Sequence, residues 1–132
     1  MITPLLSAMG PLILWPIELV LPYPYIVEEV FKGIIIYMIL GVAVRRTREK
    51  LVILSAVLFS LSESVMYLFN IALVGNTDTF LLRLLLTIGM HLSTFLIIYL
   101  LAETNRKLLP FGVFAGFGIH FLYNFLIPFF FS

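Results

Sequence analysis

The sequence contains no cysteine, which excludes disulfide bonds, thiolate metal ligands and cysteine nucleophiles. Charged residues are also scarce, at 11% of the 132 residues, which is about half the fraction that a soluble domain carries. The formal net charge is only +1, so a nucleic-acid partner is not expected. With 62% hydrophobic residues, the chain has the composition of an integral membrane protein in a lipid bilayer.

Five apolar segments cover most of the chain, at residues 4–22, 25–44, 51–74, 80–102 and 110–131. Each is close to the length of about 20 residues that crosses a bilayer as a helix. The first contains Pro11 and Pro16, so we expect a kinked span or a re-entrant segment there. The sequence therefore predicts an all-α, polytopic membrane bundle of about five transmembrane segments, in a single domain over residues 1–132. The start lacks the basic region of a signal peptide, so we expect it to belong to the mature protein.

Basic residues gather in two predicted loops, at residues 45–50 and 103–107. These loops hold Arg45, Arg46, Arg48, Lys50, Arg106 and Lys107. Cytoplasmic loops carry an excess of Lys and Arg, so both loops are predicted to be cytoplasmic. With five spans, the N-terminus would then be cytoplasmic and the C-terminus outside.

Two carboxylates, Glu28 and Glu29, open the second apolar segment, and Lys32 follows one turn later. Charged side chains inside a membrane helix are costly and usually mark function. Glu28 and Lys32 are four residues apart and share a helix face, whereas Glu29 is rotated from Glu28 by about 100°. One Lys cannot neutralise two Glu, so we expect a surplus carboxylate to meet polar partners from other helices.

Such partners occur on three later segments, as Glu63, His91, His120 and Asn124. At about 1.5 Å per residue, these residues and the Glu pair lie about 15–24 Å from the predicted cytoplasmic ends of their helices. Each would carry a large desolvation penalty if it stood alone in the bilayer. The sequence therefore predicts that they meet in one layer of the bundle.

Two chemical mechanisms suit such a layer. A Glu can be the general base that activates water, while a His and the Asn124 amide donate hydrogen bonds to an oxyanion. Alternatively His91, His120 and a Glu bind a divalent metal such as zinc. The helical His-Glu-x-x-His spacing is absent, so the second mechanism depends on convergence in the tertiary structure. Two non-enzymatic alternatives are a scaffold or immunity-type protein with a satisfied polar network and a proton- or ion-coupled carrier.

The order of these residues resembles a known family. Glu28-Glu29-Val30-Phe31-Lys32 matches Glu-Glu-x-x-Lys, Phe59-Ser60-Leu61-Ser62-Glu63 matches Phe-x-x-x-Glu, and His91 and His120 follow on separate helices. This order resembles the PrsW family of intramembrane proteases, in a superfamily with the CAAX-processing and bacteriocin-processing (CPBP) proteases. The stretch from His120 to Asn124 also resembles the His-x-x-x-Asn motif of the CPBP branch. The resemblance covers residues from about 24 to 128.

The resemblance implies an intramembrane endopeptidase that cleaves membrane-protein or lipidated-protein substrates in or near the bilayer. Glu28 would activate the attacking water, with Glu29 and Lys32 in support, and Glu63 would take a position that is a His in CPBP relatives. We therefore expect a glutamic protease with no obligatory cofactor, a divalent metal such as zinc being the alternative. The chain is much shorter than typical members, which leaves room for a homo-oligomer or partner that supplies substrate-access elements.

The resemblance also implies roles for the later polar residues. His91 would help to hold the water or the substrate carbonyl, and His120 and Asn124 would form the oxyanion site. The predicted catalytic residues are Glu28, Glu29, Glu63, His91, His120 and Asn124, with Lys32 in support.

Overall fold

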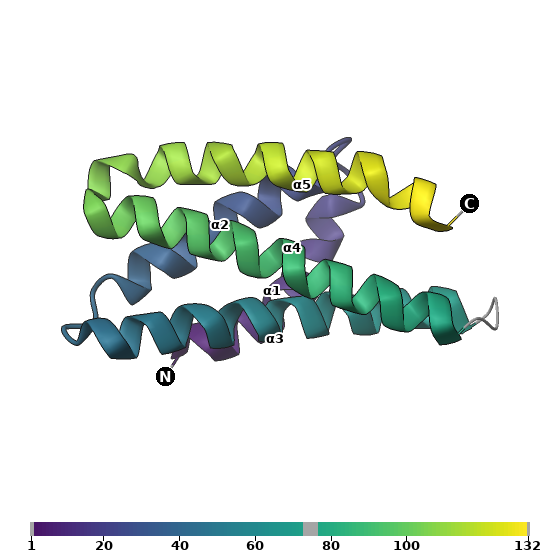
Figure 1. Cartoon of the computed structure of the whole chain (residues 1–132), viewed down its shortest axis with the longest axis horizontal. Coiled ribbons are helices and arrows are strands. Elements are labelled where there is room, and N and C mark those ends of the chain that lie inside the picture. Colours follow the sequence, from purple (N-terminus) through teal and green to yellow (C-terminus); the bar gives the residue numbers. More distant parts are fainter. Residues whose placement is uncertain (1, 73–76, 132) are drawn as a thin grey trace.

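Helices make up nearly all of the computed structural model, which describes the backbone of residues 2–72 and 77–131. The five α-helices, with one 3-10 turn before the last, are α1 (Ile2–Glu18), α2 (Pro24–Ile39), α3 (Arg45–Ala72), α4 (Thr77–Thr104), η1 (Arg106–Leu108) and α5 (Leu109–Phe131). No strand occurs within these two described ranges. The all-α bundle predicted from the sequence is confirmed (Figure 1).

Helix α1 is one 17-residue helix that contains Pro11 and Pro16. It ends at Glu18, before the residue 22 that the hydropathy pattern predicted. Proline restricts the residue before it to extended conformations, so Pro22 and Pro24 favour a break at this point. Pro24 then begins α2, where its missing N–H is no loss because the first helical N–H groups have no partner in the helix.

Helix α2 is shorter than predicted and ends at Ile39 rather than at residue 44. Its buried face carries apolar side chains toward the end, with Ile35, Ile36 and Ile39 almost fully buried. The guanidinium of Arg106 donates to the Leu40 carbonyl at 3.0 Å, which satisfies one of the carbonyls left free at a helix end.

Long helices α3 and α4 each have 28 residues and run antiparallel along the molecule (Figure 1). The predicted loop at residues 45–50 is instead the start of α3. There Arg45 pairs with Glu49 one turn on, at 3.1 Å, and Arg48 reaches Glu103 on α4 at 2.7 Å. Opposite charges four residues apart stabilise a helix, which explains why α3 starts earlier than predicted. The predicted end of the third segment, at residue 74, lies outside the described residues.

The five helices surround one apolar core, and one face of α2 packs against α1, α4 and α5. Close approach depends on small residues: a Cβ on Gly112 would lie 2.9 Å from the Ile98 Cα, and one on Gly10 would lie 2.9 Å from the Phe59 ring. Because neighbouring helices cover the inner face of α2, polar side chains on that face are removed from lipid and can meet residues of those helices.

The outer surface is apolar, as a lipid environment requires. Phe114 and Phe129 on α5 are 74% and 71% exposed, and a water-facing surface rarely carries many such side chains. Among the described helices, two stretches are long and apolar enough to cross a membrane, Phe80–Thr104 and Arg106–Phe129. The helix Ile2–Glu18 is apolar but shorter.

Candidate metal centre

Four helices contribute polar side chains to one interior region. Helix α2 brings Glu28, Glu29 and Lys32 from adjacent turns, and all three are buried. Glu63 comes from α3, His91 from α4 and His120 from α5. These side chains form two groups with different contacts, so the layer predicted from the sequence is divided.

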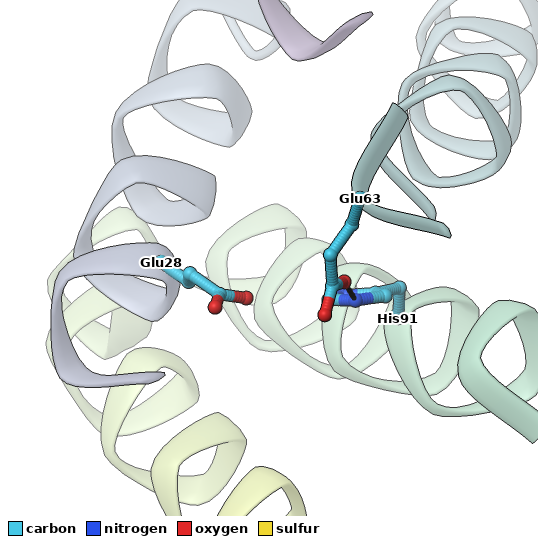
Figure 2. Close-up of side chains that lie close together, drawn as sticks. All are labelled: Glu28, Glu63 and His91. Carbon is cyan, nitrogen blue, oxygen red and sulfur yellow. Dashed lines mark hydrogen bonds and ion pairs between the residues drawn. The ribbon is translucent and has the colours of Figure 1, made fainter. Parts of the chain in front are cut away.

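The first group, here called the carboxylate–histidine group, consists of Glu28, Glu63 and His91. One ligand atom from each residue lies within 4.8 Å of the others. The Glu63 carboxylate is hydrogen-bonded to Nε2 of His91, and the Glu28 carboxylate points toward this pair from the opposite helix (Figure 2). Three separate helices therefore converge on one point.

Within this group, the polar atoms are incompletely satisfied. The Glu28 residue is 7% exposed, and its Oε2 has no hydrogen-bond partner among the described residues. The closest ion-pair contact of that oxygen is Nδ1 of His120, at 3.9 Å. Nδ1 of His91 is likewise buried without a hydrogen bond in the described part of the chain. Buried polar atoms in native proteins are nearly always hydrogen-bonded, so these two atoms are available to a ligand.

The second group, here called the lysine-centred group, consists of Lys32, Glu29, His120 and Thr94. The Lys32 ammonium donates to Glu29 Oε1 at 2.5 Å and to the Thr94 hydroxyl at 3.0 Å. Nδ1 of His120 donates to the same Glu29 oxygen at 2.9 Å. Glu29 and Lys32 are fully buried, and each charge has a partner.

Aromatic rings and glycine complete the surroundings of the lysine-centred group. The Lys32 ammonium lies 5.5 Å from the Phe59 ring centre and 5.8 Å from that of Phe95, distances at which a ring face attracts a cation. A Cβ on Gly116 would lie 2.5 Å from Glu29 Oε2. Glycine at this position on α5 is therefore what lets the Glu29 carboxylate reach His120.

The predicted site residues are placed as follows. Five predicted catalytic residues and Lys32 lie in the two groups: Glu28, Glu29, Glu63, His91 and His120. Asn124 is exposed and lies outside both groups. Thr94 was not among the predicted site residues, although it stands three residues after His91 and on the same helix face. The sequence did not predict the hydrogen bond of 2.7 Å between Thr87 and Tyr123, which joins α4 to α5.

A divalent cation fits the carboxylate–histidine group. Two carboxylates and one imidazole are a suitable donor set for a catalytic metal, which takes three protein ligands and keeps a further position open. His120 is not one of the three, so the set differs from the pair of His plus one Glu considered from the sequence. Lys32 and Arg83 both act electrostatically on Glu63. Even so, the three carboxylates of the two groups outnumber these two cations.

Fold and site together define a helical membrane protein with a candidate metal centre in its interior. A family model described as "PrsW family intramembrane metalloprotease" matches residues 17–132. The chain therefore belongs to the PrsW family, which makes it an integral membrane protein and an intramembrane protease. The matched range contains every candidate residue and confirms the resemblance to the PrsW family seen in the sequence. No curated protein and no solved structure matches the chain.

Proposed function

We propose that the protein is a metal-dependent intramembrane endopeptidase in which Glu28, Glu63 and His91 hold a divalent cation such as zinc. The observation that carries this proposal is the convergence of three ligand atoms within 4.8 Å, together with a buried Glu28 oxygen that has no hydrogen-bond partner among the described residues. When bound, such a cation polarises a peptide carbonyl and makes water a better nucleophile. The family description supports the same class.

In this proposal the lysine-centred group orients a histidine. Glu29 accepts the Nδ1 hydrogen of His120, which selects one tautomer and leaves the other ring nitrogen for the substrate. A buried acid plays the same part beside the histidine of a serine protease triad. Lys32 offsets the charge of Glu29, because a buried carboxylate without a partner would be strongly destabilising. Glu29 is then a positioning residue for His120 and does not act on water.

A glutamic mechanism is the second candidate, in which Glu28 itself takes the proton from water without a metal. The unpartnered Glu28 Oε2 favours it too, and so does the relation to the CPBP branch that we infer from the His120-to-Asn124 motif. This mechanism assigns His120 and Asn124 to the oxyanion site. Asn124 would have to move inward from its exposed position.

The same proposal includes topology and substrates. We infer a multi-pass protein in which the basic start of α3 and the basic turn η1 face the cytoplasm, in one domain over residues 1–132. The contact of Arg48 with Glu103 and that of Arg106 with the Leu40 carbonyl support this inference, because they gather basic residues at one end. The substrates would be single-span or lipidated proteins, and a second copy could complete the path by which they enter.

Proteolysis in liposomes tests the proposed function. Purified full chain would receive a pool of single-span peptides, with and without a chelator, beside Glu28→Gln and the control Glu49→Gln. Glu49 is also a glutamate, but it lies near the start of α3, far along that helix from Glu63, in an exposed pair with Arg45. Loss of cleavage on chelation, with recovery on adding zinc, is the expected result.

Other results select other functions. Cleavage that resists chelation but disappears in Glu28→Gln would establish the glutamic mechanism. A folded protein that cleaves no peptide in the pool, and whose Glu28→Gln form differs only in stability, would favour a scaffold with a buried polar network.

A further inference from the structure

Glu18 is a charged residue that continues the buried face of helix α1. The buried face of α1 repeats every three or four residues, through Ser7, Pro11 and Leu14. Glu18 comes four residues after Leu14 and so falls on the same face. Packing alone would favour an apolar side chain there, because this face of α1 lies against α3 and α2.

Glu18 is partly buried, and one of its two carboxylate oxygens is unsatisfied. Its Oε1 is buried and lacks a hydrogen-bond partner within the described ranges. A buried polar atom without a partner is costly, and more so where lipid rather than water surrounds the protein. Such an atom favours a bound ligand or water, because no described side chain supplies a partner.

The charges around Glu18 show what kind of partner is required. The negative charge of Glu63 acts on Glu18, and those of Glu63 and Glu18 both act on Glu28. Glu18 therefore lies near the carboxylate–histidine group, two of whose members are also carboxylates. Lys32 is engaged with Glu29 and Thr94 in the lysine-centred group. Like charges in a low-dielectric interior repel one another unless a cation lies between them.

We propose that Glu18 is an outer residue of a divalent-cation site whose ligands are Glu28, Glu63 and His91. This inference rests on the proposed function and extends the site to a fourth helix. Glu18 is not among the atoms that lie within 4.8 Å of one another, so it acts from outside the ligand set. It adds negative charge and orients a water molecule, as carboxylates beside metal ligands commonly do. Helix α1 is then part of the centre.

Cobalt binding tests the inference without a substrate. Co²⁺ would be titrated into the purified full chain in detergent and followed by visible absorption, for the wild type, Glu18→Gln, Glu63→Gln and Glu49→Gln. We expect Glu18→Gln to weaken Co²⁺ binding about 10–100-fold and to keep the band positions, because the ligand set is intact. Glu63→Gln should change or remove the bands, and Glu49→Gln should match the wild type.

Thermal unfolding of the metal-free protein separates this role from a structural one. Glu18→Gln removes a negative charge from an acidic group, so its Tm without metal should equal or exceed that of the wild type. The rise in Tm on adding Co²⁺ should be smaller, since that rise follows affinity. Glu18→Asp keeps the charge and should recover most of the affinity.

Two results would overturn the inference. If Glu18→Gln bound Co²⁺ as tightly as the wild type, or only lowered the metal-free Tm, Glu18 would be structural while the metal centre remained. If the wild type bound no Co²⁺, zinc or manganese, the proposed metal-dependent function itself would fail.

Discussion

Glu28 and Glu29 are adjacent in the sequence, but their carboxylates meet different partners. Glu29 is fully buried, and its Oε1 accepts hydrogen bonds from Lys32 and His120, whereas its Oε2 has no hydrogen bond from a described residue. Glu28 faces Glu63 and His91, and its Oε2 has no hydrogen bond from a described residue either. A charge with its partners in place holds a structure together, whereas one without them is available to a ligand. The comparison indicates that the Glu pair divides two tasks between its members.

The largest effect of a single substitution, a loss of peptide cleavage, is expected at Glu28. Glu28→Gln keeps the shape but removes a candidate metal ligand or base, so cleavage should fall by about 10²–10⁴-fold. Folding should be preserved, because no hydrogen bond to the changed oxygen is lost. Peptide cleavage in liposomes and Tm measure the two properties, with Glu49→Gln as control. A large fall in Tm would contradict the division of tasks.

A substitution at Lys32 should lower the free energy of unfolding. Lys32→Met keeps most of the length but leaves the Glu29 carboxylate buried with only His120, and breaking a buried ion pair costs about 3–5 kcal/mol. Denaturant unfolding in mixed micelles measures the change. The double variant Lys32→Met with Glu29→Gln should recover part of the loss, because the charge that lacked a partner is gone. Additive losses would show that the two residues do not act as a pair.

Gly116→Ala should disturb the lysine-centred group from the other side. The new Cβ would lie 2.5 Å from Glu29 Oε2, so the carboxylate or the helix must shift, at about 1–3 kcal/mol. Gly118→Ala is the matched control on α5, because nothing lies within 4 Å of its Cβ position. That control should be neutral or slightly stabilising, since Ala favours a helix over Gly. Equal stability of the two variants would place Glu29 elsewhere.

At Thr94 the expected loss of stability is no larger than at Gly116. Thr94→Val keeps the shape but removes the hydroxyl that accepts from Lys32 and donates to the His91 carbonyl, at 3.0 and 3.1 Å. A hydrogen bond to a charged group contributes about 1.5–3 kcal/mol, and the ion pair with Glu29 remains. Thr94→Ser should restore stability. If Ser failed while Val was tolerated, the methyl group rather than the hydroxyl would be the important part.

Much of the site followed from the sequence. Polar side chains in apolar segments are too costly to stand alone, so Glu28, Glu29, Lys32, Glu63, His91, His120 and Asn124 were predicted to meet. All of them except the exposed Asn124 lie in the two groups. Their depths agreed because a helix rises by a constant amount per residue. The helix ends were predicted less well, since pairs such as Arg45 with Glu49 extend a helix into what composition marks as a loop.

Composition and periodicity alone thus determined the class of fold, the membrane environment and the residues of the centre. Tertiary structure decided which residue meets which. The pairing of His91 with Glu63, and of His120 with Glu29, depends on how closely the helices approach. That approach is set by glycines such as Gly116, whose missing side chain leaves room for a partner. Hydropathy and spacing describe each helix by itself, whereas these distances arise only when the helices pack.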